Sequence, residues 1–214
     1  MARIVRKSKV GQLTGKLGDV VTGEWNGITY VRDVPKKSTR PPSQAQLEQR
    51  ARFALLNSFM RKITQYANIG FKEFAIGKTP TNIAITMNSQ HLITGTYPDY
   101  SIDITKLILS SGTLSGLVLA SVKSEQAGVI TLEWKANTTR GYAQANDELL
   151  VMTYEATTGD VEVEIRVAQR SDGSFVMELD DYIGETLHVF ASFVSKDGQR
   201  VSNSEYLGTV TVAG

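Results

Sequence analysis

The sequence predicts an α+β fold that is mainly β: an N-terminal β-hairpin plus helices, followed by a seven-stranded immunoglobulin-like or fibronectin-like β-sandwich. Three observations support this prediction. An Asn-Gly pair separates two β-prone runs near the N-terminus. A helical period of three and four residues follows over residues 43–66. A period of two then dominates from residue 117 onward.

A glycine-rich hairpin is predicted within residues 15–32. Asn-Gly favours a two-residue turn between antiparallel strands, so we expect the chain to reverse at Asn26-Gly27. The hairpin residues taken as candidate site residues are Gly15, Lys16, Gly18, Trp25 and Gly27. Residues 35–42 cannot continue the sheet, because their prolines lack a backbone donor and their charges favour water. We predict an exposed basic arm there.

A long helix is predicted to begin at Ser43, because Ser43 and Gln46 have the spacing of a capping box. Its apolar residues form one wide stripe, which predicts burial on more than one side, against the hairpin and the distal domain. They are Leu47, Ala51, Phe53, Ala54, Leu55, Leu56, Phe59, Met60, Ile63 and Tyr66. A short helical piece is expected over residues 71–76.

A further helix is expected to begin at Thr79-Pro80 and to end near His91, since threonine caps a helix well and proline suits its first turn. Residues 95–98 are interpreted as a linker. We therefore predict two domains, a basic hairpin-plus-helix module over residues 1–95 and an acidic β-sandwich over residues 96–214.

Seven short strands are predicted in the second domain, where apolar and polar residues alternate between turn signals. Their expected ranges are residues 117–122, 130–136, 148–155, 161–167, 174–179, 186–194 and 206–212. Trp134 on the second of these strands is expected to be the core aromatic residue. Because the chain has no cysteine, the sandwich is expected to be stabilised by packing without a disulfide.

The charge is divided between the two halves of the chain. Residues 1–80 contain 15 Lys or Arg and 5 Asp or Glu, a net charge of +10, whereas residues 81–214 contain 8 and 17, a net charge of −9. Such asymmetry predicts an electrostatic partner. Three partners fit it: nucleic acid, another acidic surface, or the opposite end of a second copy.

The basic arm is the candidate interaction site, with Lys36, Lys37, Arg40, Arg50 and Arg52 as its residues. In the interpretation that we prefer, the arm contacts the acidic sheet of a neighbouring copy, because this uses both charged halves. The alternative is phosphate binding. Nucleic acid would also require exposed aromatic residues nearby, and only Trp25 and Tyr30 are close in sequence.

The sequence offers no catalytic centre, so we predict no enzyme, no cofactor and no metal site. Its two histidines, His91 and His188, fall in different predicted domains; His91 is expected to end a helix and His188 to face solvent. Acidic clusters at residues 147–148, 160–164 and 178–181 lack the spacing of a calcium loop and are interpreted as a solvated sheet surface.

No stretch is apolar enough to span a membrane. Residues 10–20 interrupt any signal-peptide core, because they include glycines and polar residues. We expect synthesis in a bacterial cytoplasm without a recognisable signal peptide, followed by assembly into a particle or a surface structure.

Several segments resemble an uncharacterised domain family that is widespread in Bacteroidetes, over nearly the whole chain. They are residues 15–21, 25–27, 40–46, 50–53, 97–98, 109–114 and Trp134. The glycine hairpin, proline arm and Arg-Ala-Arg-Phe helix are also similar to segments of phage-derived structural proteins. The resemblance implies a bacterial or phage origin and a non-enzymatic role, and it assigns no catalytic residue.

Our hypothesis at this stage is a structural, self-assembling building block, phage-derived or surface-associated, whose copies associate head to tail. The first alternative is a nucleic-acid-binding protein that uses the basic N-terminal half. The second is a carbohydrate-binding sandwich, for which Tyr142, Tyr154 and Tyr182 are the aromatic residues to examine.

Overall fold

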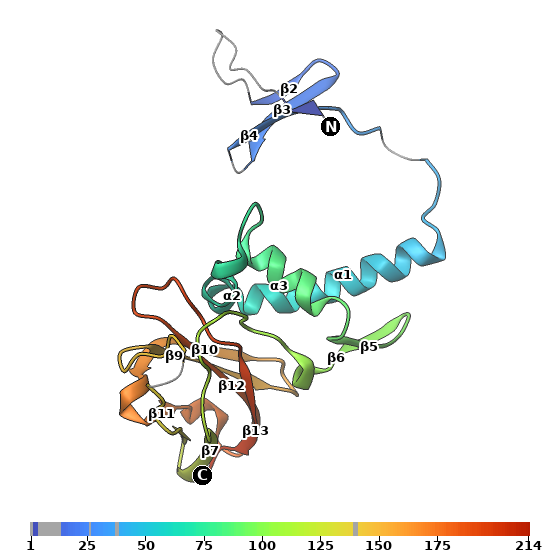
Figure 1. Ribbon diagram of the computed structural model, residues 1–214. Helices are drawn as coiled ribbons and strands as arrows, with labels where there is room; N and C mark the ends of the chain where they lie inside the picture. The colour runs from blue at the N-terminus through green and yellow to red at the C-terminus, as the bar shows by residue number, and fades with distance from the viewer. Residues whose placement is uncertain (1, 4–13, 26, 37–38, 139–140) are drawn as a thin grey trace. The chain divides into compact units, whose positions relative to one another are not determined.

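The computed structural model in Figure 1 describes residues 2–3, 14–25, 27–36, 39–138 and 141–214. Contacts divide the chain into two compact units, Met1–Gln44 and Ala45–Gly214.

Unit 1 is a small antiparallel sheet with the strand order β1-β4-β3-β2. Its strands are β1 (Ala2–Arg3), β2 (Gly15–Leu17), β3 (Val20–Trp25) and β4 (Ile28–Asp33). The predicted hairpin is confirmed, because Trp25 pairs with Ile28 and Gly27 has a φ of 75°, which only glycine adopts readily. Asn26 lies outside the described residues. Strands β1 and β2 are too short for the alternation of apolar and polar residues to identify them in the sequence.

Unit 2 contains the β-sandwich that the sequence predicts, with all its strand pairs antiparallel. One sheet has the order β11-β8-β7, formed by Ser174–Glu178, Val129–Glu133 and Ser121–Gln126. The other has the order β10-β9-β12-β13, formed by Val161–Gln169, Glu148–Glu155, Thr186–Val194 and Glu205–Thr211. Six of these described strands lie close to their predicted ranges, and β9 and β12 match them to the residue. The first is displaced: β7 begins at Ser121, four residues after the predicted start, and shares only residues 121 and 122 with the predicted range.

A hydrophobic core fills the space between the two sheets. It includes Ile130 and Leu132 of β8, Val151 of β9, and Phe193 of β12. Trp134 is 6% exposed and packs edge-on against Phe193, with ring centroids 5.8 Å apart. Its role as the core aromatic residue is therefore confirmed.

Helices cover one face of the four-stranded sheet of the sandwich, β10-β9-β12-β13 (Figure 1). This is the outer face, directed away from the three-stranded sheet. They are α1 (Gln44–Lys62), α2 (Thr64–Gly70) and α3 (Pro80–Asn88). Leu150 and Met152 of β9 and Phe190 of β12 belong to the same core as the buried residues of the helices, which include Phe59. Because side chains alternate along a strand, β9 contributes to one core on each face.

Helix α1 begins at Gln44, directly after Ser43 as predicted, and its buried residues within unit 2 lie in its second half. The expected packing of the helix on the hairpin stays a prediction. Phe53 is 54% exposed, whereas Phe59 is 5% exposed. Helix α3 begins at the predicted cap, where Thr79 Oγ1 accepts a hydrogen bond from the Asn82 backbone N–H at 3.2 Å. It ends at Asn88, before His91.

Residues 95–98 are not a linker. They belong to a β-hairpin formed by β5 (Ile93–Thr96) and β6 (Asp99–Ile102). The remaining short elements are the 3-10 turns η1 (Lys72–Phe74), η2 (Ile104–Lys106), η3 (Arg170–Asp172) and η4 (Asp180–Tyr182). In the structure, helical residues of 45–95 share a core with the four-stranded sheet. The predicted division into domains 1–95 and 96–214 stays a prediction.

Candidate interaction site

The register of the N-terminal sheet separates its side chains onto two faces, because directly paired residues of antiparallel strands lie on the same face. We define the aromatic face by the residues paired in alternate rows: Lys16, Val21, Gly23, Trp25, Ile28, Tyr30 and Arg32. The opposite face contains Leu17, Val20, Thr22, Glu24, Thr29, Val31 and Asp33. Aromatic and basic side chains therefore share one face.

Tyr30 lies across its partner Gly23 on the aromatic face. A Cβ atom on Gly23 would lie 2.7 Å from the Tyr30 Oη atom and 2.8 Å from its Cζ atom. The tyrosine ring thus occupies the space that a side chain at position 23 would need. The hydroxyl end of the ring therefore lies over the backbone of β3.

The N-terminal sheet has no core of its own. Among the described residues from 14 to 44, no side chain is buried. Leu17 is 63% exposed, Trp25 47% and Ile28 42%. A small sheet is stabilised when one of its faces packs against another layer. The exposed apolar residues therefore mark an interaction surface.

The residues of the predicted basic arm divide between the two units. Lys36 and Arg40 are exposed in unit 1, and Lys37 lies outside the described residues. Arg50 is exposed on α1, whereas Arg52 is half-buried with its guanidinium 5.6 Å from the centre of the Tyr100 ring. Their role in association stays a prediction.

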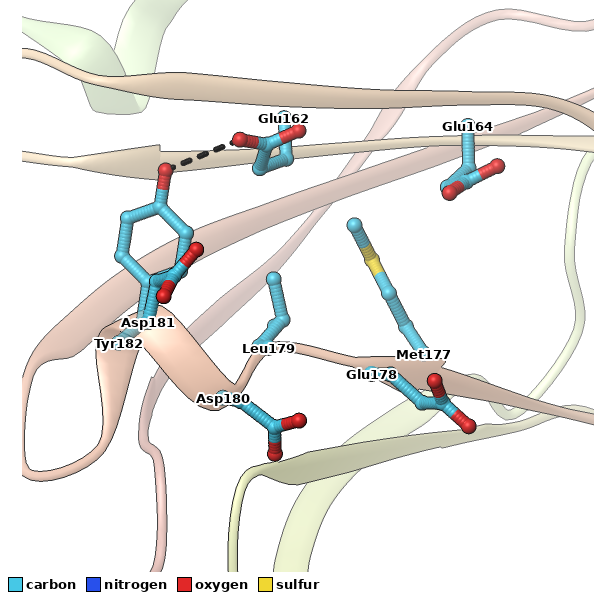
Figure 2. A pocket seen from close by; sticks show the side chains of 8 residues that line it. All are labelled: Glu162, Glu164, Met177, Glu178, Leu179, Asp180, Asp181 and Tyr182. Atoms are coloured by element: carbon cyan, nitrogen blue, oxygen red, sulfur yellow. Dashed lines mark hydrogen bonds between the residues drawn. The ribbon is translucent and has the colours of Figure 1, made fainter.

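Acidic side chains from two predicted clusters meet in space (Figure 2). They line a pocket of about 290 Å³ between β10 and the end of β11. Its carboxylates are Glu162, Glu164, Glu178, Asp180 and Asp181, and no basic residue lines it. Tyr182 also lines it and donates a hydrogen bond to Glu162 Oε1 at 3.1 Å. Burial, together with this carboxylate, raises the pKa of Tyr182 to about 12.

The strand geometry explains this meeting. Val161, Val163 and Ile165 pack against the core of the helices, so the alternate residues Glu162 and Glu164 are directed to the other face of the sheet. Residues 160–164 and 178–181 were predicted as a solvated surface, and they form one acidic surface. The sequence could not reveal that the two clusters are adjacent.

The expectation of a solvated surface is wrong for Asp147 and Glu148. Asp147 is fully buried, and Arg170 Nε donates to its Oδ2 atom at 3.0 Å. The Arg170 guanidinium also donates to the backbone oxygen atoms of Ser115 and Gly116, at 2.7 and 3.1 Å. Burial lowers the pKa of Arg170. This pair joins segments that are distant in sequence and is structural.

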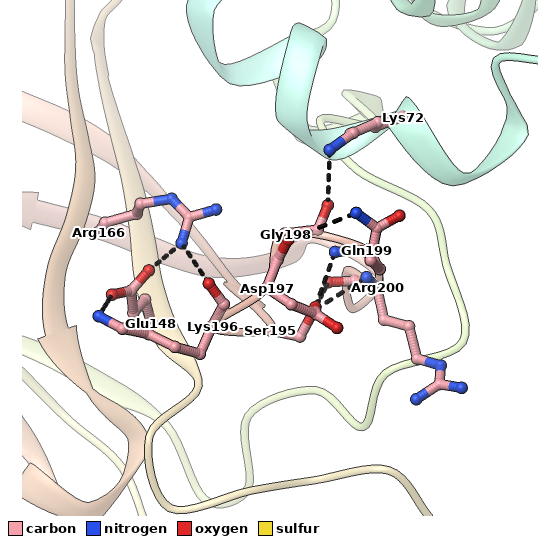
Figure 3. Close-up of polar contacts among 9 residues, drawn as sticks. All are labelled: Lys72, Glu148, Arg166, Ser195, Lys196, Asp197, Gly198, Gln199 and Arg200. Atoms are coloured by element: carbon pink, nitrogen blue, oxygen red, sulfur yellow. Dashed lines mark hydrogen bonds and ion pairs between the residues drawn. The ribbon is translucent and has the colours of Figure 1, made fainter.

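Glu148 lies between two cations (Figure 3). It accepts hydrogen bonds from Arg166 and from Lys196, whose Nζ atom lies 2.6 Å from Glu148 Oε1. Burial alone would raise the pKa of this carboxyl, but Lys196 and Arg166 together hold it below its usual range. In the same region Lys72 Nζ donates to the Gly198 carbonyl oxygen at 3.1 Å. These contacts connect η1 and β10 with the loop after β12.

The structure does not bring the candidate tyrosines together. Tyr142 packs against the Arg200 guanidinium, at 3.8 Å from ring centre to Cζ. Tyr154 packs edge-on against Phe59 of α1, and Tyr182 belongs to the acidic pocket. They therefore form no common platform for a sugar ring.

The two histidines differ from expectation. His188 is half-buried, and its Nδ1 atom lies 2.8 Å from the Tyr206 hydroxyl. Burial lowers its pKa. The ring packs against Tyr154 and Tyr206, so it faces solvent only in part. His91 lies three residues beyond the end of α3.

Across the described part of the chain, no group of three or more His, Cys, Asp or Glu could hold a metal ion. No described helix is long and apolar enough to cross a membrane.

Residues 11–208 match the model of a family of unknown function, DUF6266. The chain belongs to this family. Membership confirms the resemblance to an uncharacterised domain family, and it transfers no catalytic or binding residue. The taxonomic range and the likeness to phage proteins stay predictions. No curated protein matches the chain.

Among solved structures the chain is similar to fibronectin type III domains. One is from human collagen alpha-1(XX), at 12% identity and a TM-score of 0.37, covering 49% of this chain and 91% of that one. Another is a chicken CNTN1 fragment, at 8% identity and a TM-score of 0.40, covering 48% and 34%. A third is from human contactin 1, at 10% identity and a TM-score of 0.32, covering 56% and 94%. The likeness concerns the fold alone.

Proposed function

We propose that this chain is a non-enzymatic structural module that self-associates head to tail, with its N-terminal sheet and basic arm contacting the acidic surface of a second copy. The observation that carries the proposal is that no side chain is buried among the described residues 14–44, which include β2, β3 and β4 of the N-terminal sheet. A sheet of this size gains stability when an apolar face is covered. A second copy of the chain offers a surface that can cover this apolar face.

Charge complementarity supports the direction of the contact. Residues 1–44 contain nine Lys or Arg and three Asp or Glu, a net charge of +6. The pocket lined by Glu162, Glu164, Glu178, Asp180 and Asp181 has the opposite sign. Opposite surfaces on one chain give heterologous contacts, which close into rings or extend into filaments.

In this arrangement apolar contact would supply most of the affinity. Leu17, Val20 and Val31 lie on the opposite face of the N-terminal sheet and are at least partly exposed. The charges of the arm and the pocket would mainly set the orientation and the rate of association. The resemblance to phage structural proteins supports a phage-derived or surface-associated particle as the setting.

Light scattering after size exclusion tests this proposal on the full-length chain, at about 50 and about 200 mM salt. We expect a species larger than a monomer whose mass falls as salt rises. The triple reversal Lys36→Glu, Lys37→Glu and Arg40→Glu should lower the mass at the lower salt concentration. The control reverses two exposed basic residues of unit 2, Lys78→Glu and Lys135→Glu, and should leave the mass unchanged.

Two results would contradict self-association as described. One is a monomer at both salt concentrations. The other is an oligomer whose mass the arm reversal leaves unchanged. A charge exchange provides a positive result: Asp180→Lys with Asp181→Lys should weaken the wild-type assembly and restore association with the arm-reversed chain.

A further inference from the structure

We propose that the aromatic face of the N-terminal sheet binds single-stranded nucleic acid. In this site the bases stack on Trp25 and Tyr30, and Lys16 and Arg32 contact the phosphates. The inference goes beyond self-association and uses the other face of the sheet.

The aromatic rings are placed as separate stacking surfaces. Trp25 pairs with Ile28 in one row, and Gly23 pairs with Tyr30 in the next row on the same face. Rows on one face of a strand are two residues apart, about 7 Å. The Tyr30 ring reaches over Gly23 and is half-buried, so a second aromatic ring lies in the row next to the exposed indole. Bases of any sequence can stack on such rings.

The basic side chains occupy the third row of the same face. Val21 pairs with both Lys16 and Arg32, so the two cations flank it on neighbouring strands. Both side chains are exposed. A strand whose bases occupy the first two rows would therefore extend its phosphates toward a positive row, within a unit of net charge +6.

The chemistry of this face favours bases over an acidic protein surface. The face of an aromatic ring carries negative charge density, so it repels a carboxylate, whereas it attracts a stacked base. Simple attraction to an acidic patch would require Lys16 and Arg32 but would leave Trp25 without a role. The combination of both features is typical of proteins that bind single strands.

Binding is tested with fluorescein-labelled oligothymidylate and oligouridylate of about 12 nucleotides, a length within the usual site sizes. Fluorescence anisotropy with the full-length chain measures affinity, and a duplex of the same length is the comparison. Intrinsic fluorescence gives a second readout. The chain has two tryptophans and Trp134 is buried, so quenching by the oligonucleotide reports on Trp25. The two probes distinguish DNA from RNA as the source of the strand.

We expect Trp25→Ala to weaken binding by about tenfold or more, because one stacked base is lost. Trp25→Phe should retain most of the affinity. Ile76→Ala is the matched control, an exposed apolar residue of unit 2, and should bind as the wild type does. Lys16→Glu with Arg32→Glu should reduce the slope of log affinity against log salt by about 1.4, at about 0.7 for each phosphate contact.

The proposal is overturned if neither oligonucleotide binds at about 50 mM salt. It is also overturned if Trp25→Ala binds as the wild type does, or if the duplex binds equally well with no quenching, since charge alone would explain both results. Circular dichroism of each variant establishes that the sheet is intact. Because Trp25→Ala leaves the arm and the acidic pocket unchanged, it should not alter the oligomer mass, so this proposal and self-association fail separately.

Discussion

At the scale of single residues, the most consequential side chain is a buried arginine. Arg170 is fully buried and pairs with the equally buried Asp147. Its guanidinium also lies 4.0 Å from the centre of the Phe193 ring and 2.6 Å from Asn137 Oδ1. Such a charge is tolerated in a core only when its donors are satisfied. Arg170 therefore couples β12 to the loops at one end of the sandwich.

Replacing this arginine should be severely destabilising. We expect Arg170→Met to lower the free energy of unfolding by about 3–5 kcal/mol, because Asp147 would remain as an uncompensated buried charge. Urea denaturation followed by circular dichroism measures the change. Arg200→Met is the control: Arg200 is exposed over Tyr142, so its loss should cost about 1 kcal/mol or less. Equal losses in the two variants would contradict the role given to Arg170.

Prediction from the sequence succeeded at residues whose signal is local. Gly27 was predicted as a turn residue because it follows Asn26 in a two-residue turn. Trp134 was predicted as a core residue because apolar and polar residues alternate along the predicted strand 130–136. Arg170 had no such signal. Its partners lie at positions 115, 116, 137 and 147, so only the folded chain brings them together. The position of Tyr30 over Gly23 could not be predicted from the sequence either, because it depends on which residues pair across the two strands.

At the scale of elements, the two halves of α1 behave differently. Both halves continue one apolar pattern, yet only the second half is buried against the four-stranded sheet. Periodicity identifies the face of a helix that can be buried. The length over which burial occurs depends on where the sheet ends, and the sequence of the helix does not contain that information.

Two phenylalanines on this helix make the difference measurable. Phe59→Ala should lower the free energy of unfolding by about 3–5 kcal/mol, because it leaves a cavity beside Tyr154. Phe53→Ala on the exposed half is the matched control and should change it by about 0.5 kcal/mol or less. Chemical denaturation of both variants tests this. A large loss from Phe53→Ala would show that the exposed half of α1 is covered in solution.

At the scale of the whole molecule, the chain is divided by contacts and by charge at different places. Contacts separate residues 1–44 from residues 45–214, whereas the charge changes sign near residue 80. The helices of residues 44–88 are basic in part but pack on the sandwich. The sign of the net charge therefore changes within unit 2, between segments that share one core.

Limited proteolysis distinguishes the two divisions. We expect trypsin to cut the full-length chain first after Lys36 or Lys37, because the described residues around them are exposed and outside strands and helices. The product should be a stable fragment that begins near residue 38 and includes all three helices. Mass spectrometry of the early products identifies the site. Trypsin has no Lys or Arg to cut between Lys78 and Lys106, so proteinase K, which has broad specificity, is used in a parallel digest. First cleavage by proteinase K near residues 95–98 would instead support the predicted boundary between residues 95 and 96.

The sequence by itself determined the mainly β class, the hairpin turn, six of the seven described sandwich strands and the starts of α1 and α3, because turn chemistry, capping and periodicity act between near neighbours. Tertiary structure alone decided which face each strand covers, the burial of Asp147 and Arg170, and the meeting of two acidic clusters in one pocket. It also decided that the helices belong with the sandwich. These features depend on contacts between residues far apart in the chain, which form only when the two sheets and the helices pack together.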